Sequence, residues 1–220
     1  MDQVTQQAKG RTLSALEFVL AAAVVVGHNV WAVVPNEVPI LALAALISVR
    51  VREGGWGALG FRRPKSWLRV VLIALAAVVL RLIVSDPIEA VLTPIFGAPS
   101  TSAIVTSSPH DLRWMITTLA LVWTFAAFGE EISYRGYLTL RGSDALGGST
   151  VAWIVATVIA AVLFGVGHYY KGPVGMIDSG VAGLILGAAY LLSGRCLWTT
   201  ILAHGLIDTT GVTLLYLGLA

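Results

Sequence analysis

Long apolar runs without a charged residue limit what this chain can fold into. Residues 116–129 read ITTLALVWTFAAFG, carry no charge, and lead directly into Glu130 and Glu131. Only 12% of the 220 residues are charged, whereas a soluble domain has about 25%. A helix needs about 20 mostly apolar residues to cross a bilayer, and a membrane barrel would show short alternating strands instead. The sequence therefore predicts an all-α, polytopic integral membrane protein.

The apolar segments predict a bundle of about seven or eight transmembrane helices in a single membrane domain, residues 1–220. The helices that we expect span residues 12–34, 38–50, 67–85, 113–138, 150–170, 178–193 and 197–218. In the sixth helix, Gly183 and Gly187 form a GxxxG pair, with Gly180 one turn earlier. Small residues allow helices to approach closely in a bilayer, so we expect this helix to pack tightly within the bundle.

The distribution of Lys and Arg predicts the orientation in the cell membrane, because cytoplasmic loops carry an excess of these residues. Basic residues precede the first helix, cluster at residues 50–69, and recur after the fourth and sixth helices. The turn after the first helix and residues 82–112 have no Lys or Arg. We therefore expect a cytoplasmic N-terminus, a cytoplasmic 50–69 loop and an external C-terminus.

Other simple features exclude several classes of protein. The single Cys196 excludes an internal disulfide and a cysteine-based metal cluster. The N-terminal MDQVTQQAKGR is polar and the first apolar run is long, so no cleavable signal peptide is predicted. The net charge of +2 gives no indication of a nucleic-acid partner; the expected surroundings are a lipid bilayer.

Ionisable residues within apolar helices are candidates for function, because burying them in a membrane is costly. They are Glu17, His28, Arg81, Glu130, Glu131, His168, His204 and Asp208. Arg81 lies close enough to a helix end for its side chain to reach the interface, which favours a structural role. Glu17 and His28 are three helical turns apart and share a face, as a packing or proton-linked pair would.

Two carboxylates in the fourth helix can take different roles. Glu131 and Arg135 are four residues apart with the acid first, the favourable order for an ion pair on one helix face. Glu130 is rotated by about 100° from Glu131 in an α-helix and can face another direction. One carboxylate can thus be held ionised by Arg135 while the other exchanges protons, a common arrangement for acid–base chemistry.

Two further helices carry chemically capable side chains at the same four-residue spacing. His204 and Asp208 share one face of the last helix, and Phe164 and His168 share one face of the fifth, in FGVGH. Three helices therefore each turn a functional group inward.

These three groups of residues resemble the motifs of the CPBP family of intramembrane proteases. That family includes the type II CAAX prenyl endopeptidases and the bacterial Abi and bacteriocin-processing proteins. The motifs are matched by Glu130, Glu131 and Arg135 (EExxxR), Phe164 and His168 (FxxxH), and His204 and Asp208 (Hxxx(D/N)). The resemblance covers a core at about residues 113–212. Three motifs in this order are far more specific than any one of them.

The resemblance implies endopeptidase activity on a membrane-anchored protein or peptide, with no cofactor. In the family, the first glutamate and the second-motif histidine are taken to activate water, which here are Glu130 and His168. The third-motif histidine and its partner are taken to stabilise the oxyanion, which here are His204 and Asp208. Because an ionised aspartate would repel an oxyanion, we expect Asp208 to orient and charge His204.

Three alternatives remain open from the sequence. A zinc-dependent protease could use His168, His204, Asp208 and Glu130 as ligands, although no HExxH motif stands on one helix. A non-catalytic membrane adaptor or immunity-type protein could share the fold. A proton-coupled transporter is a third reading, but the chain is short and shows no inverted repeat.

Overall fold

The computed structural model describes residues 3–100 and 110–219, and these ranges contain helices and turns but no strand. The helices are α1 (Gln3–Asn29), α2 (Glu37–Glu53), η1 (Trp56–Leu59), α3 (Trp67–Phe96), α4 (Leu112–Leu121), η3 (Val122–Leu138), α5 (Thr139–Ala145), α6 (Thr150–Val166), η4 (Tyr169–Lys171), α7 (Gly172–Leu192) and α8 (Leu197–Leu217). Because α4, η3 and α5 follow one another without a break, they form one long helix. The predicted all-α class is confirmed.

Five of the described helical segments are long and apolar enough to cross a membrane. They are residues 6–29, 67–96, 112–145, 169–192 and 197–217. Helix α6 is apolar but has 17 residues, as does α2, and 17 residues rise only about 26 Å against a hydrocarbon core of about 30 Å. All seven predicted helices are thus present, and two of them are at the short end of the length that spans a bilayer.

The third helix differs from the prediction at its C-terminal end. It was expected to end at residue 85, yet α3 continues through Pro87 and Pro94 to Phe96. A proline removes one backbone donor from a helix, a loss that membrane helices tolerate where other groups satisfy the freed carbonyl. The polar Ser85 is also accommodated, because its hydroxyl donates to Asp178 of α7 at 3.3 Å.

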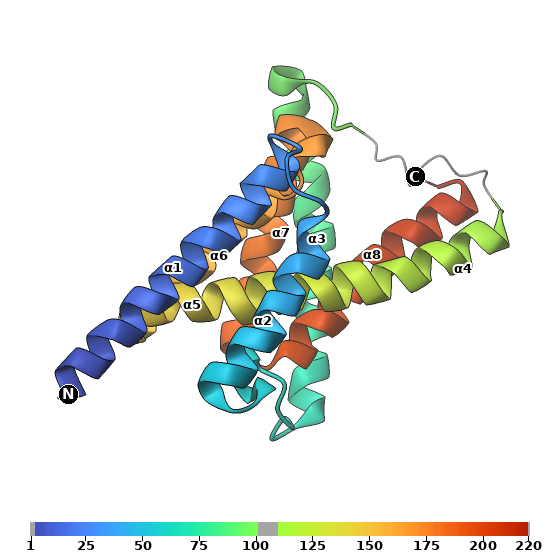
Figure 1. Ribbon diagram of the computed structural model, residues 1–220. Coiled ribbons are helices and arrows are strands. Elements are labelled where there is room, and N and C mark those ends of the chain that lie inside the picture. The colour runs from blue at the N-terminus through green and yellow to red at the C-terminus, as the bar shows by residue number, and fades with distance from the viewer. Residues whose placement is uncertain (1–2, 101–109, 220) are drawn as a thin grey trace.

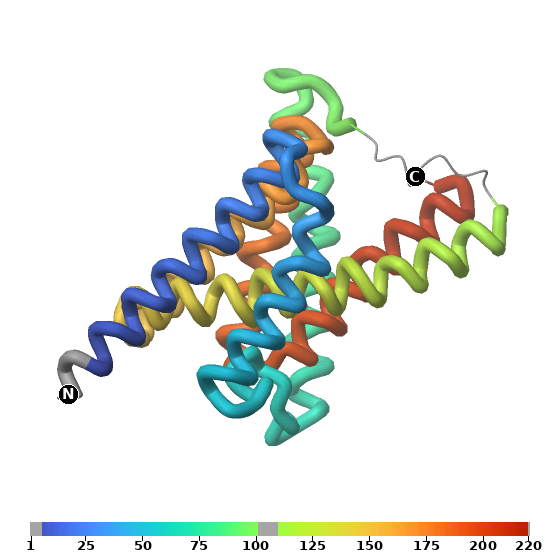
Figure 2. The backbone as a smooth tube through the Cα atoms, viewed as in Figure 1, coloured from blue at the N-terminus to red at the C-terminus, as the bar shows by residue number. Residues whose placement is uncertain are grey.

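The arrangement of the helices places the middle of the long helix at the centre of the molecule. Figures 1 and 2 show residues 112–145 crossing the direction of α3 and α7. The η3 segment packs against α2 and α8, while α7 packs against α6, α3 and α8. Buried aromatic residues of η3, including Tyr134 and Tyr137, join the main apolar core. Any group carried by η3 therefore lies between several helices.

Glycines allow α6 and α7 to pack closely, as the sequence predicted for the helix at residues 178–193, which corresponds to part of α7. A Cβ atom at Gly183 would lie 3.1 Å from the Cα atom of Ala161, and one at Gly187 would lie 2.4 Å from a methyl group of Thr157. On the α6 side, a Cβ at Gly165 would lie 2.6 Å from the carbonyl oxygen of Met176. These spacings leave no room for a side chain at the interface.

Replacing Gly165 by alanine is therefore expected to destabilise the protein by about 1–3 kcal/mol, the usual cost of overpacking. The matched control is Gly211→Ala, because a Cβ at Gly211 of α8 meets nothing within 4 Å and alanine favours a helix. Thermal unfolding in detergent, followed by tryptophan fluorescence, measures both variants. Equal melting temperatures for the two would contradict close α6–α7 packing.

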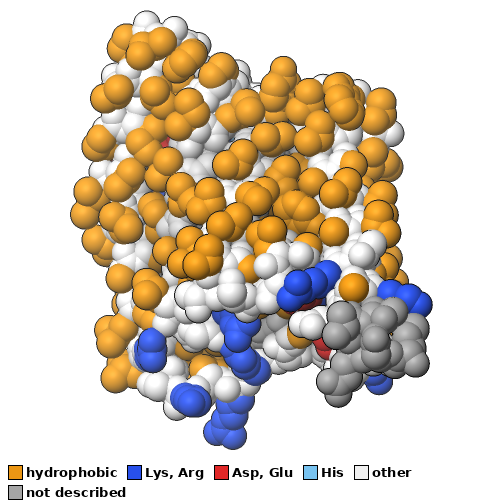
Figure 3. Space-filling view, turned by 90° about the vertical axis from the view of Figure 1, so that its left-hand side faces the viewer, with side chains coloured by type: hydrophobic (Ala, Val, Ile, Leu, Met, Phe, Trp, Pro, Cys, Tyr) orange, Lys and Arg blue, Asp and Glu red, His pale blue; other side chains and the backbone are white. Residues whose placement is uncertain are grey.

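The outer surface is that of a membrane protein. Large apolar side chains face outward, among them Leu20 (66% exposed), Ile83 (64%) and Val162 (61%). Figure 3 shows apolar side chains covering most of one face, with Lys and Arg gathered at one end of it. Such a surface is stable against lipid rather than against water.

Candidate active site

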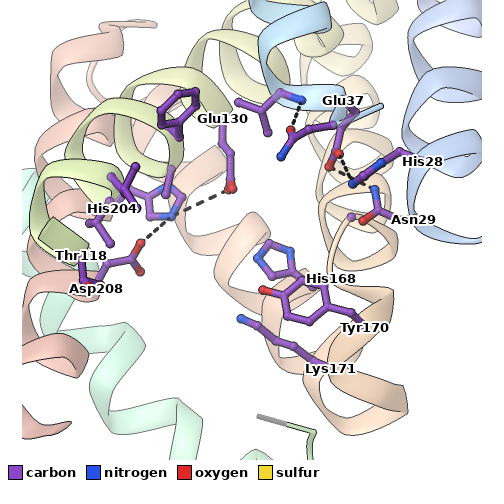
Figure 4. A pocket seen from close by; sticks show the side chains of 17 residues that line it. His28, Asn29, Glu37, Thr118, Glu130, His168, Tyr170, Lys171, His204 and Asp208 are labelled. Atoms are coloured by element: carbon purple, nitrogen blue, oxygen red, sulfur yellow. Dashed lines mark hydrogen bonds and ion pairs between the residues drawn. The ribbon is translucent and has the colours of Figure 1, made fainter. Parts of the chain in front are cut away.

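A cavity of about 500 Å³ opens between the α1–α2 connection, the long helix, the turn η4 and α8 (Figure 4). Its volume falls within the range of small-ligand sites. Four of the predicted site residues line it, Glu130, His168, His204 and Asp208.

The π-helix η3 separates the two neighbouring glutamates. In a π-helix the backbone bonds run from each residue to the one five positions earlier, and such turns are frequent at functional sites. At the end of η3, both the backbone N–H and the hydroxyl of Thr139 donate to the carbonyl oxygen of Tyr134. Glu131 is fully buried, whereas the side chain of Glu130 is 18% exposed and lines the cavity. The two carboxylates thus occupy different surroundings.

Glu131 is held behind the cavity wall by two cationic or donor groups. Its Oε1 atom lies 3.0 Å from Nη1 of Arg135, so the ion pair expected from the spacing is present. The same oxygen lies 2.8 Å from Nδ1 of His204, and because a carboxylate only accepts, Nδ1 donates. Glu131 therefore fixes the orientation of the His204 ring, a contact that the sequence did not indicate.

The other ring nitrogen of His204 faces the cavity. Nε2 lies 3.5 Å from Oδ2 of Asp208 and 4.0 Å from Oε2 of Glu130, and Figure 4 shows both carboxylates converging on it. When the ring carries two protons, Nε2–H is a donor directed into the cavity. The expected role of Asp208 in orienting and charging His204 is consistent with this geometry.

Phe164 of α6 connects the parts of the site. Its ring lies 4.3 Å below the guanidinium of Arg135, and its centroid lies 4.7 Å from that of His168 and 5.9 Å from that of His204. A desolvated cation over an aromatic face is stabilised by about 2 kcal/mol. The FxxxH phenylalanine is thus a packing platform beneath Arg135 and both histidines.

His168 lies in the turn between α6 and η4, not within a helix that extends to residue 170 as predicted. Its Nδ1 lies 2.8 Å from the carbonyl oxygen of Phe164. A carbonyl can only accept, so Nδ1 carries the proton and Nε2 of the neutral ring is free to accept one. Figure 4 shows this ring on the side of the cavity that faces the Glu130 carboxylate.

A zinc site would need three or four of these side chains to converge on one point. Within residues 3–100 and 110–219, no group of three or more His, Cys, Asp or Glu side chains is arranged to hold a metal ion. One nitrogen of His204 is already bonded to Glu131.

Glu17 and His28 are not partners of each other, so the idea of a linked pair is wrong. Glu17 lies 2.9 Å from Arg52 and 2.5 Å from the fully buried Arg141. His28 lies 3.3 Å from Glu37 and faces the cavity. The first belongs to a structural charge network and the second to the cavity rim.

Arg81 keeps its expected structural role but by a different contact. Instead of extending to the interface, its guanidinium pairs with the buried Asp178 of α7. Asp178 is also an ionisable residue in an apolar segment, GMIDSGVAG. The rule that such charges are costly to bury could therefore have identified it as a candidate. Lys171 and Glu37, which line the cavity, lie in predicted turns where that rule gives no signal.

Comparison with known families adds independent information. Residues 112–210 match the family model described as type II CAAX prenyl endopeptidase Rce1-like. This match covers just under half of the chain and supports its resemblance to the CPBP family. The matched range contains all seven motif residues, four of which line the cavity. The match indicates a CAAX-type intramembrane endopeptidase in general terms. Neither the curated proteins nor the solved structures that were compared contain a match to the chain.

Proposed function

We propose that this protein hydrolyses a peptide bond of a membrane-associated protein or peptide with water activated by Glu130 and His168. The observation that carries the proposal is the position of Glu130. Its Oε2 atom is buried, lines the cavity, and accepts no hydrogen bond from any described side chain or backbone group. A carboxylate oxygen with free acceptor capacity beside a cavity is suited to take a proton from water.

The reaction divides between the two sides of the cavity. Water hydrogen-bonded to Glu130 and to Nε2 of His168 attacks the carbonyl carbon of the peptide bond, and Glu130 takes the proton. Glu130 then returns this proton to the leaving amine as the carbon–nitrogen bond breaks. The products are a new carboxyl end and a new amino end, and the site regains its initial protonation state.

His204 is the proposed donor to the oxyanion. Its Nδ1–H is held by Glu131 and its Nε2 faces the cavity next to Asp208. A preorganised donor of this kind contributes about 3–4 kcal/mol to the transition state in other hydrolases. Asp208 and Glu131 support the charged form of the ring, and neither needs to contact the substrate.

The orientation is a separate part of this proposal. We propose that the protein lies in the cell membrane with its N-terminus and the 50–69 loop in the cytoplasm. The gathering of basic side chains at one end of the molecule (Figure 3) supports it, because basic loops stay on the cytoplasmic side.

Replacing His168 by alanine is expected to lower the hydrolysis rate by about 10²–10⁴-fold, the contribution of one acid–base group. The assay uses purified protein in lipid nanodiscs and a library of membrane-anchored peptides, with cleavage sites identified by mass spectrometry. The control is His110→Ala, because His110 precedes α4 and is exposed.

Two outcomes of this assay would change the proposal. Unaltered cleavage by His168→Ala would remove His168 from the mechanism, and no cleavage of any peptide by the parent would favour a non-catalytic adaptor. A zinc chelator should leave the rate unchanged. Loss of activity that added zinc restores would favour the metal-dependent alternative.

A further inference from the structure

Lys171 differs from the other cationic side chains near the site because it lacks an acidic partner. Arg81 pairs with Asp178 and Arg135 with Glu131. Among the described residues, no carboxylate oxygen lies within ion-pair distance of the Lys171 amine, which lies 5.8 Å from the centre of the Tyr170 ring. Ionisable side chains in apolar spans are usually paired, and Lys171 lies at the start of the apolar span 169–192. An anion from outside the chain could therefore serve as its partner.

The amine lies where the catalytic cavity meets a second groove. Lys171 lines the main cavity and also a groove of about 460 Å³ between α3, α4 and α8. Asp208 of the proposed catalytic group lines both spaces as well. Figure 4 shows the Lys171 side chain beside Tyr170 and His168, with its amine directed toward the space between His168 and Asp208. A substrate bound at His204 would therefore pass within reach of this amine.

The position of Lys171 is fixed by its neighbour on α7. A Cβ atom at Gly175 would lie 2.2 Å from the Cβ of Lys171 and 3.3 Å from its Cγ and Cδ atoms. The lysine stem therefore lies against the first turn of α7 in the space that the glycine leaves. The residue is half-buried, so packing restricts the lysine stem.

The charges around the cavity indicate which anion would fit. Lys171 is the only Lys or Arg among the described residues that line the main cavity, and Glu37, Glu130 and Asp208 line it too. Three nearby carboxylates would repel a group with several negative charges, whereas a single carboxylate can pair with one ammonium. Peptides carry such a group at the C-terminus or on an Asp or Glu side chain.

We infer that Lys171 binds a carboxylate of the peptide substrate and thereby selects substrates with a negative charge next to the cleaved bond. The inference rests on the proposed function, since it assumes a peptide in the cavity. Lys171 is a specificity-determining residue in this account, and it takes no part in the proton transfers.

Binding of a labelled probe tests the inference without turnover. The probe is one fluorescent apolar peptide in three forms: with a free C-terminal carboxylate, with a C-terminal amide, and with the amide plus one internal glutamate. Fluorescence anisotropy gives the Kd of each form for detergent-solubilised Glu130→Gln protein. A charge-assisted hydrogen bond contributes about 1.5–3 kcal/mol, so at least one carboxylate form should bind about tenfold tighter or more than the plain amide.

Variants of the same protein assign the preference to Lys171. Lys171→Gln should remove it, Lys171→Arg should retain part of it, and Gly175→Ala should reduce it by displacing the lysine stem. The control is Lys65→Gln, an exposed lysine of the basic loop, which should keep the full preference. The form that binds tighter, free terminus or internal glutamate, identifies the source of the carboxylate.

Three results would overturn the inference: equal affinity for all forms, a preference that survives Lys171→Gln, or no binding of any form. In the first two cases, continued cleavage by the parent protein would leave the proposed function intact. A parent protein that neither binds nor cleaves peptides would overturn both.

Discussion

Glu130→Gln is expected to reduce peptide hydrolysis by about 10²–10⁴-fold and to leave the protein folded. Glutamine keeps the size and shape of the side chain but cannot accept a proton from water at neutral pH. The packing should be unaffected, because Oε2 of Glu130 has no hydrogen-bond partner within the described residues. Cleavage rate and thermal stability, measured on the same preparation, check both halves of the prediction.

The control for Glu130 is Asp86→Asn. This change also removes one negative charge, but Asp86 is an exposed residue of α3 and should not affect the rate. Glu130→Asp adds a graded test, because it keeps the carboxylate and withdraws it by one methylene, and it should retain more activity than glutamine. Full activity of Glu130→Gln would assign water activation to another group, with His168 as the first candidate.

The sequence predicted where the helices lie better than whether a helix is of the α or the π type. The long helix that carries the glutamates was expected at residues 113–138, and it exists, but η3 is a π-helix. Its composition, VWTFAAFGEEISYRGYL, has no feature that distinguishes π from α winding. The η3 segment packs against α2 and α8, and packing of this kind is not visible in a single sequence.

In the candidate site, contacts within one helix were predicted and the contact between helices was not. Contacts along one helix were predictable from spacing, as with Glu131 and Arg135 or His204 and Asp208. The contact that joins these two pairs, from Nδ1 of His204 to Glu131, crosses 73 positions of sequence. No local rule gives such a contact.

Glu131 therefore has two partners, and this double contact links stability to activity. Arg135 compensates the buried charge of Glu131, and Glu131 in turn orients His204. A change at Arg135 acts on His204 through Glu131, and also through the Phe164 ring that lies beside both. The site thus depends on a residue that does not line the cavity.

Arg135→Ala is expected to produce the largest loss of stability, because it leaves Glu131 buried without its cation. Breaking a buried ion pair from one side costs about 3–5 kcal/mol, and the contact between Arg135 and the Phe164 ring, 4.3 Å away, is lost as well. Arg135→Lys should be milder, since it keeps the charge but loses the planar group that stacks on the ring. Yield of folded protein, melting temperature and cleavage rate should fall in the order parent, Lys, Ala.

A double variant separates the two roles of this ion pair. In Glu131→Gln with Arg135→Met, both charges are absent, and neutral replacement of a buried ion pair is often tolerated. Its melting temperature should therefore recover most of what Arg135→Ala loses. Its cleavage rate should stay low, because His204 lacks the carboxylate that holds Nδ1–H. If the rate recovered together with stability, Glu131 would be only the partner of Arg135, and His204 would be oriented by Asp208 alone.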